Sequence, residues 1–202
     1  MKISIRIGII IAGLLFLYVE SHAARSKRPL QQRLRSVVLM SADGKSDSLS
    51  STERHKATVF VFLSSECPIS NSYMPMLTKL STEFAPQDIV FFGVIADPDV
   101  PVEEAKKFGS DFKFPGDILM DSKQELAAIL SAHITPEVVI ISSSGKTLYQ
   151  GRIDDRYVAL GKARMSARHN DLRDALTNIA GGKKVKNPST KVIGCSIPII
   201  AK

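Results

Sequence analysis

The sequence predicts an α/β domain built on a central mixed sheet flanked by helices. Residues 58–63 form a continuous run of β-branched and aromatic side chains, which is typical of a strand buried on both faces. From there to residue 130, strand patterns alternate with helical patterns, and this order implies right-handed crossovers between parallel strands. After residue 136 the pattern changes to two strands joined by a tight turn, followed by one amphipathic helix. We therefore expect a parallel core closed by a C-terminal β-hairpin and helix.

Periodicity and turn signals place the other elements. Further strands are expected at 37–40, 89–95, 117–120, 138–141 and 147–151, and helices at 73–84, 102–108, 124–130 and 172–179. Turn sequences at 42–45 and 143–146 mark two hairpins, and the glycine pair 181–182 ends the last helix. Cys67 and Pro68 lie between the first buried strand and the first helix, so Cys67 is expected at a helix start.

Residues 1–23 have the features of a secretory signal peptide. Lys2 and Arg6 give a positive start, residues 7–19 form an uncharged apolar run, and residues 21–23 (Ser-His-Ala) resemble a small-x-small cleavage site. The run is shorter than the roughly 20 residues that a membrane-spanning helix needs, which favours cleavage over an uncleaved anchor. We expect export to the periplasm or another extracytoplasmic compartment, with no stable membrane insertion after the signal is removed.

The rest of the chain divides into three parts. Residues 24–35 are basic and polar and are expected to form a flexible leader, residues 36–181 form the domain, and residues 182–202 form a C-terminal tail that carries Cys195. With 44% hydrophobic and 23% charged residues, the composition is that of an ordinary globular protein. The net charge is +7, but no nucleic-acid motif accompanies the basic residues, so we expect no nucleic-acid partner.

Cys67 is the strongest candidate for chemistry. The free N–H groups and the positive end of a helix stabilise a thiolate, which lowers the pKa of a thiol below its ordinary value of about 8.5. Glu66 and Glu137 argue the other way, because a nearby carboxylate disfavours a second negative charge. The alternative from the residues alone is a buried, inert cysteine.

Three residues give the chain a resemblance to thioredoxin-like proteins. They are Cys67 at the strand–helix junction, Pro75 eight residues later in the helix, and Pro136 before the hairpin. The resemblance covers roughly residues 35–180 and is to the redoxin branch, which holds thiol–disulfide oxidoreductases and the peroxiredoxins. It implies a thioredoxin-like fold and a cis peptide bond between Thr135 and Pro136. It also implies that this turn faces the reactive cysteine and offers a backbone edge to a substrate segment.

Departures from the patterns of these relatives bear on the reaction. Residues 67–70 read Cys-Pro-Ile-Ser, without the second cysteine of thioredoxins, so dithiol exchange within one loop is impossible. Ser64, three residues before Cys67, resembles the Thr or Ser of peroxiredoxins. However, Phe60 stands where those enzymes have a proline, and no arginine lies near Thr135 in the sequence to hold a peroxide. Thiol–disulfide exchange is therefore favoured over peroxide reduction.

Two other groups of residues allow different interpretations. Arg152 and Arg156, beyond the hairpin, are candidates for the missing cation, although solvent-facing charges fit them better. Cys67 and His133 offer a thiolate and an imidazole, which suit copper. In copper-handling relatives of this fold a second cysteine stands where this chain has Asn71. The metal site is thus incomplete, so we expect no metal and no other cofactor and interpret His133 as a helix-end residue.

Cys195 is expected to be the resolving partner of Cys67. A mixed disulfide or sulfenic acid on Cys67 must be released by a second thiol, and Cys195 is the only other cysteine of the chain. The alternative is that Cys195 lies in a tail or bridges to another molecule. The expected catalytic set is therefore Cys67, Cys195, Pro136, Thr135 and Ser64.

Together these features predict an exported thiol–disulfide oxidoreductase with Cys67 as its nucleophile. Its partners are expected to be a substrate, which is a thiol or disulfide of a protein or a small molecule, and a separate electron donor. One alternative is a peroxiredoxin-like thiol peroxidase. Another is a non-catalytic module that binds a partner peptide along the Pro136 edge or handles copper.

Overall fold

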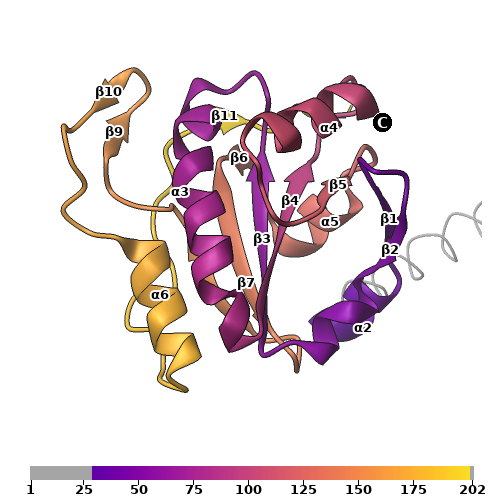
Figure 1. Ribbon diagram of the computed structural model, residues 1–202, viewed down its shortest axis with the longest axis horizontal. Helices are drawn as coiled ribbons and strands as arrows, with labels where there is room; N and C mark the ends of the chain where they lie inside the picture. Colours follow the sequence, from indigo (N-terminus) through magenta and orange to yellow (C-terminus); the bar gives the residue numbers. More distant parts are fainter. Residues whose placement is uncertain (1–28, 201–202) are drawn as a thin grey trace, which may run out of the picture.

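A twisted seven-stranded sheet with helices on both faces forms the body of the molecule (Figure 1). The structure is a computed structural model, and it describes residues 29–200. The predicted signal peptide, residues 1–23, lies outside the described residues, as does the beginning of the predicted leader. Among the described helices, none combines the length and the apolar character needed to cross a membrane.

The strands of the main sheet follow the order β2-β1-β5-β4-β3-β7-β8. Their bounds are β1 Val38–Ser41, β2 Ser46–Ser48, β3 Ala57–Leu63, β4 Ile89–Ile95, β5 Ile118–Met120, β7 Glu137–Ser142 and β8 Thr147–Gly151. The three strands β3, β4 and β5 are parallel, whereas β1, β2, β7 and β8 join antiparallel. The expected mixed sheet with a parallel core and a C-terminal hairpin is confirmed.

Helices cover the two faces of this sheet. They are α2 Leu30–Arg35, α3 Pro68–Phe84, α4 Val102–Asp111, α5 Glu125–Leu130 and α6 Asp171–Ala180, with 3₁₀ turns η1 Leu49–Arg54 and η2 Ala85–Gln87. Buried side chains of α3, α4 and α6 pack together on one face, and those of α2 and α5 pack on the other. This division follows from the strands, since successive side chains of a strand point to opposite faces. In β3 all seven residues are buried, as expected for a central strand.

Two short ladders lie outside the main sheet. One joins β9 (Tyr157–Ala159) to β10 (Lys162–Ala163) in a hairpin that projects beside α3 (Figure 1). The other joins β6 (Ile134–Thr135), just before Pro136, to β11 (Cys195–Ser196) near the end of the chain. The second ladder brings the C-terminal residues to the turn that faces α3.

The end of the predicted leader is ordered. Residues 30–35 form α2, and the side chain of Leu34 is fully buried among the apolar residues of that face. Arg35 pairs with Glu53 of η1 through its guanidinium group. The folded domain therefore begins before residue 36, because a short apolar stripe within a basic and polar segment covers the sheet.

The C-terminal residues 183–197, which we call the strap, also pack on the domain rather than forming a free linker. Thr190 holds the strap to β8: its backbone N–H donates to Gln150 O (3.1 Å), and its hydroxyl lies 2.8 Å from Tyr149 Oη and accepts from Arg152 N (3.0 Å). A side chain on Gly151 would collide with Thr190, since a Cβ there would lie 2.1 Å from its Oγ1. The predicted C-terminal tail is therefore held against the domain at Thr190.

Replacing Thr190 by valine is expected to loosen the strap. The substitution keeps the shape of the side chain but leaves the N–H of Arg152 without its acceptor, which costs about 1–3 kcal/mol of unfolding free energy. Urea unfolding measures this loss. The matched control is Thr177→Val on the exposed face of α6, where the hydroxyl bonds only to the carbonyl of Arg173 in its own helix. Equal stability of the two variants would contradict the fixed strap.

Candidate active site: two thiols at one pocket

Cys67 is the N-cap residue of α3, as expected, and Pro68 occupies the first helical position. Its backbone is held on both sides, because its N–H donates to Ser64 O (3.2 Å) and its carbonyl accepts from Asn71 N (3.0 Å). The side chain is only 2% exposed, and its Sγ lies 3.3 Å from the carbonyl oxygen of Thr135. The start of α3 thus directs the thiol at the turn that carries Pro136.

The bond between Thr135 and Pro136 is cis, which confirms the prediction. Thr135 also faces the second thiol, because Cys195 is its partner in the antiparallel ladder between β6 and β11. The hydroxyl of Thr135 donates to the carbonyl of Cys195 (3.4 Å). One residue therefore contacts both cysteines, through its carbonyl on one side and its hydroxyl on the other.

The two cysteines line one pocket of about 250 Å³. It lies at the C-terminal ends of β3 and β4, where the parallel strands stop and the chain turns into loops. Its lining residues are Leu63, Ser64, Glu66, Cys67, Ala96, Asp97, Thr135, Cys195, Ser196, Ile197 and Pro198. Four of the five predicted catalytic residues thus line this pocket, and the fifth, Pro136, is bonded to Thr135.

The surroundings favour a thiolate on Cys67. Burial opposes the charge, but hydrogen bonds from the Cys195 side chain and from the backbone and hydroxyl of Ser70 outweigh it, so the pKa of Cys67 is lowered. For Cys195 burial and the neighbouring Cys67 act in the same direction and raise the pKa to about 11. Cys67 is therefore the more acidic thiol of the pair, and Cys195 beside it is protonated at neutral pH.

The two carboxylates that argued against a thiolate do not act on it. Glu66 is exposed at the rim of the pocket. Glu137 is buried in β7, where its carboxylate accepts from the N–H of His133 (3.1 Å) and from Nε2 of Gln150 (2.9 Å). Glu137 thus fixes the loop before Pro136 instead of facing the sulfur.

The two arginines considered as peroxide-binding cations lie elsewhere. Arg152 pairs with Asp171 of α6, with 2.7 Å between Nε and Oδ2. The guanidinium of Arg156 lies over the ring of Tyr73 at 4.5 Å and donates to Ser72 Oγ (3.2 Å). No lysine or arginine lines the thiol pocket among residues 29–200.

The residues considered for copper are not assembled around a metal. His133 has an exposed side chain that lines a different pocket, and Asn71 uses its amide to donate to Ser65 O (2.9 Å). Within the described part of the chain, no group of three or more His, Cys, Asp or Glu side chains gathers in a way that would hold a metal ion.

Sequence reasoning missed two residues of this site. Ser70 was considered only as the place of an absent cysteine, yet its buried hydroxyl accepts from Ser64 N (3.4 Å) and supports the thiolate. Gly194 allows β11 to approach, since a Cβ there would lie 2.1 Å from Thr135 O. A small hydroxyl residue in the first turn of the helix, and a glycine directly before a cysteine, were the available signals.

Removing the Ser70 hydroxyl is expected to raise the pKa of Cys67. The thiolate is the reactive form, so Ser70→Ala should slow iodoacetamide alkylation of Cys67 at pH 7 by about three- to tenfold. Above both pKa values the rates should converge. A rate–pH profile tests this, with Ser72→Ala as control because that hydroxyl donates to Ile69 O. Identical profiles for Ser70→Ala and the wild type would contradict the assignment.

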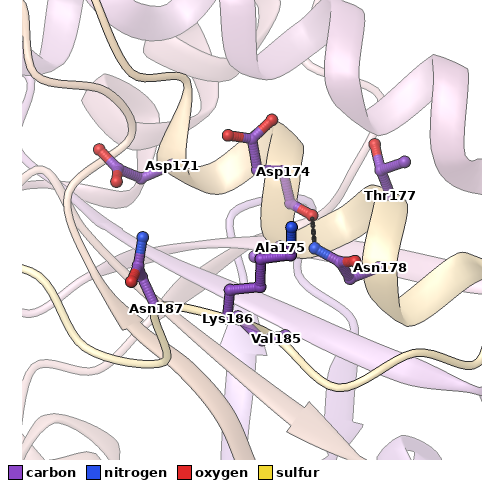
Figure 2. Close-up of a pocket in the computed structure, with 8 residues that line it drawn as sticks. All are labelled: Asp171, Asp174, Ala175, Thr177, Asn178, Val185, Lys186 and Asn187. Carbon is purple, nitrogen blue, oxygen red and sulfur yellow. Dashed lines mark hydrogen bonds between the residues drawn. The ribbon is translucent and has the colours of Figure 1, made fainter.

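A second pocket, of about 310 Å³, lies between α6 and residues 185–187 (Figure 2). Asp171, Asp174 and Lys186 contribute to its lining, and Asn178 donates to the backbone oxygen of Asp174 (2.8 Å). It contains no thiol, and Asp171 already pairs with Arg152. The candidate thiol chemistry therefore belongs to the pocket of the two cysteines and not to this one.

Comparison with known proteins identifies the family. The model of the Redoxin family matches residues 29–158, which include Cys67 and Pro136. The chain belongs to the Redoxin family. Thiol redox chemistry is the function that this membership supports, in agreement with the resemblance seen in the sequence. No curated protein sequence matches this redoxin.

Solved structures confirm the thioredoxin-like fold of this redoxin. An uncharacterized conserved protein of Geobacillus kaustophilus is 25% identical, with a TM-score of 0.74 over 82% of this chain and 89% of that one. A hypothetical protein of Sinorhizobium meliloti is 24% identical, with a TM-score of 0.74 over 82% of this chain and 92% of that one. A secreted disulfide oxidoreductase of Mycobacterium tuberculosis is 16% identical, with a TM-score of 0.54 over 75% of this chain and 98% of that one. The last two similarities, both below 25% identity, support the fold only.

Proposed function

We propose that this redoxin is an extracytoplasmic thiol–disulfide oxidoreductase in which Cys67 is the nucleophile and Cys195 the resolving thiol. The observation that carries the proposal is that both cysteines line one pocket and contact the same residue, Thr135. Export is part of the proposal because of the features of residues 1–23.

The reaction proceeds in two exchanges. In the first, the Cys67 thiolate attacks a substrate disulfide, forming a bond between Cys67 and one substrate sulfur and releasing the other substrate sulfur as a thiolate. In the second, Cys195 gives up its proton and attacks Cys67 Sγ, which releases the remaining substrate thiolate and leaves a Cys67–Cys195 disulfide. An external dithiol then reduces the protein disulfide and becomes a disulfide itself. When an external disulfide oxidises the two protein thiols instead, the same steps run in reverse and the protein oxidises substrate thiols.

The lowered pKa of Cys67 serves the first exchange and the raised pKa of Cys195 serves the second. A protonated Cys195 does not compete for the substrate, and it becomes a stronger nucleophile than an acidic thiol once it is deprotonated. Loss of negative charge on Cys67 in the mixed disulfide removes one of the causes that raise the pKa of Cys195. The first step therefore prepares the second.

Peptide mapping under non-reducing conditions tests the proposal. After oxidation of the reduced protein with a small disulfide, a peptide pair linked through Cys67 and Cys195 is expected. In Cys67→Ser no internal link forms, and Cys195 should react slowly. Two free thiols in the wild type after complete oxidation of a reference dithiol would overturn the proposal. Saturable hydrogen peroxide consumption much faster than that of an exposed thiolate would instead support the thiol peroxidase alternative.

A further inference from the structure

The backbone edge that the fold offers to a substrate segment is already filled by the chain itself. β11 pairs with β6, so that Cys195 lies opposite Thr135 and Ser196 opposite Ile134 (Figure 1). The N–H of Ile197 continues the ladder by donating to His133 O (2.9 Å). An extended protein segment adds to a sheet edge through these same backbone groups. Here it would first have to displace β11.

Displacement is opposed on both sides of β11. On one side Gly194 lies against β6, and Thr190 is bonded to β8. On the other side the side chain of Ile197 is 9% exposed within an apolar cluster. Beyond it, Gln124 Nε2 donates to the carbonyl of Pro198 (2.6 Å). The edge at Pro136 is thus closed by a segment anchored before and after Cys195.

The remaining access to Cys67 is the pocket itself. Its volume of about 250 Å³ is below the roughly 300–1,000 Å³ that drug-sized ligands occupy. Small polar and apolar groups from Ser64, Ser196, Leu63 and Pro198 line it. A small molecule fits such a site, whereas a folded protein with its own backbone does not reach the sulfur past β11.

The charges around this pocket have one sign. Glu66 lies exposed at its rim, and Asp97 is half-buried in its wall, with Oδ1 accepting from the N–H of Asp99 (2.9 Å). No cationic side chain of the described residues lines the pocket to balance them. Two carboxylates that line the same pocket repel anions and attract cations.

We propose that the substrate of this thiol pair is a low-molecular-weight disulfide bearing amino groups, rather than a segment of a protein. This inference rests on the proposed function. In the balanced reaction, two protein thiols and one diamino disulfide give two aminothiols and the Cys67–Cys195 disulfide. The transferred electrons come from the two protein thiols, so a single turnover needs no further reductant.

Single-turnover kinetics with the reduced full chain test the inference. The probes are three disulfides of similar size: cystamine, bis(2-hydroxyethyl) disulfide and 3,3′-dithiodipropionate. Each rate is divided by that of 2-mercaptoethanol with the same disulfide, which removes intrinsic reactivity. Cystamine is expected to exceed the dianion by about tenfold at low salt, with the neutral compound between them. Glu66→Gln with Asp97→Asn, or 1 M salt, should remove most of this difference.

A peptide tests the exclusion of protein segments. The peptide Ile-Gly-Cys-Ser-Ile-Pro, joined by a disulfide to 2-mercaptoethanol, repeats residues 193–198 and should react at least about tenfold more slowly than bis(2-hydroxyethyl) disulfide. Gly194→Ala, which places a Cβ against Thr135 O, should raise the ratio of peptide rate to small-disulfide rate. Gly181→Ala is the matched control, because a Cβ there meets nothing closer than 3.4 Å.

The outcomes separate the inference from the proposed function. A wild-type peptide rate equal to that of the small neutral disulfide, or a preference for the dianion, would overturn the inference and leave the function intact. Thiol release by Cys67→Ser at the wild-type rate would overturn the function itself. If cystamine reacts faster than the dianion and the peptide reacts more slowly than the small neutral disulfide, the results support both the inference and the proposed function.

Discussion

Replacing Cys195 by serine is expected to stop the reaction at a mixed disulfide between Cys67 and half of the substrate. Cys67 keeps its place at the start of α3, so the first exchange still occurs and one substrate thiol is released. The second exchange then depends on an external thiol, which has none of the proximity of a residue that shares the pocket. Turnover should fall by at least about a hundredfold, and intact-mass analysis should show the accumulated adduct.

The control for this prediction is Lys191→Ser, at an exposed position of the strap that does not line the thiol pocket. It keeps the resolving thiol and the backbone ladder, so its turnover should stay close to that of the wild type. Undiminished turnover in Cys195→Ser, without an adduct, would remove Cys195 from the mechanism. Cys67 would then work with an external thiol.

Truncating Leu34 to alanine should destabilise the whole domain. The side chain is fully buried between α2 and the sheet, although α2 lies within a segment that reads as basic and polar. Removing a buried leucine side chain beyond Cβ costs about 2–5 kcal/mol through lost transfer energy and the cavity that remains. Urea denaturation should show this loss as a lower midpoint with an unchanged slope.

Met40→Ala in β1 is the comparison for Leu34→Ala, because Met40 is 56% exposed and its loss should change stability by less than about 0.5 kcal/mol. A similar small effect at Leu34 would mean that residues 30–35 are dispensable for the fold. That result would restore the flexible leader expected from the sequence.

The central elements could be predicted because their signals are local. The strand at 89–95 agrees with β4 at both ends, and β3 begins one residue before the expected 58. Both strands carry apolar side chains on their two faces. Their prediction therefore does not depend on deciding which alternate residues face the core and which face solvent. The cysteine at the helix start and the proline before the hairpin were readable for the same reason, because they mark the ends of such strands.

The parts that escaped prediction depend on contacts between distant residues. α2 has six residues, too few for helical periodicity to stand out, and it is stabilised by packing rather than by propensity. The strap has no regular pattern, and its position is set by single contacts of Thr190 and Gly194 with β8 and β6. The sequence could suggest Cys195 as a partner by elimination, but only the ladder with β6 locates it.

The pairing of β11 with β6 joins two distant points of the chain, and this links the redox couple to the unfolding equilibrium. A disulfide between Cys67 and Cys195 would close a loop of about 130 residues, which in the chain-entropy model stabilises the fold by up to roughly 4–5 kcal/mol. In a closed thermodynamic cycle, the folded chain favours the bond by the same amount relative to the unfolded chain. About 1.4 kcal/mol corresponds to 30 mV for a two-electron couple. Substitutions that change the stability of the folded chain should therefore shift the reduction potential of the Cys67–Cys195 pair, even where they do not contact either sulfur.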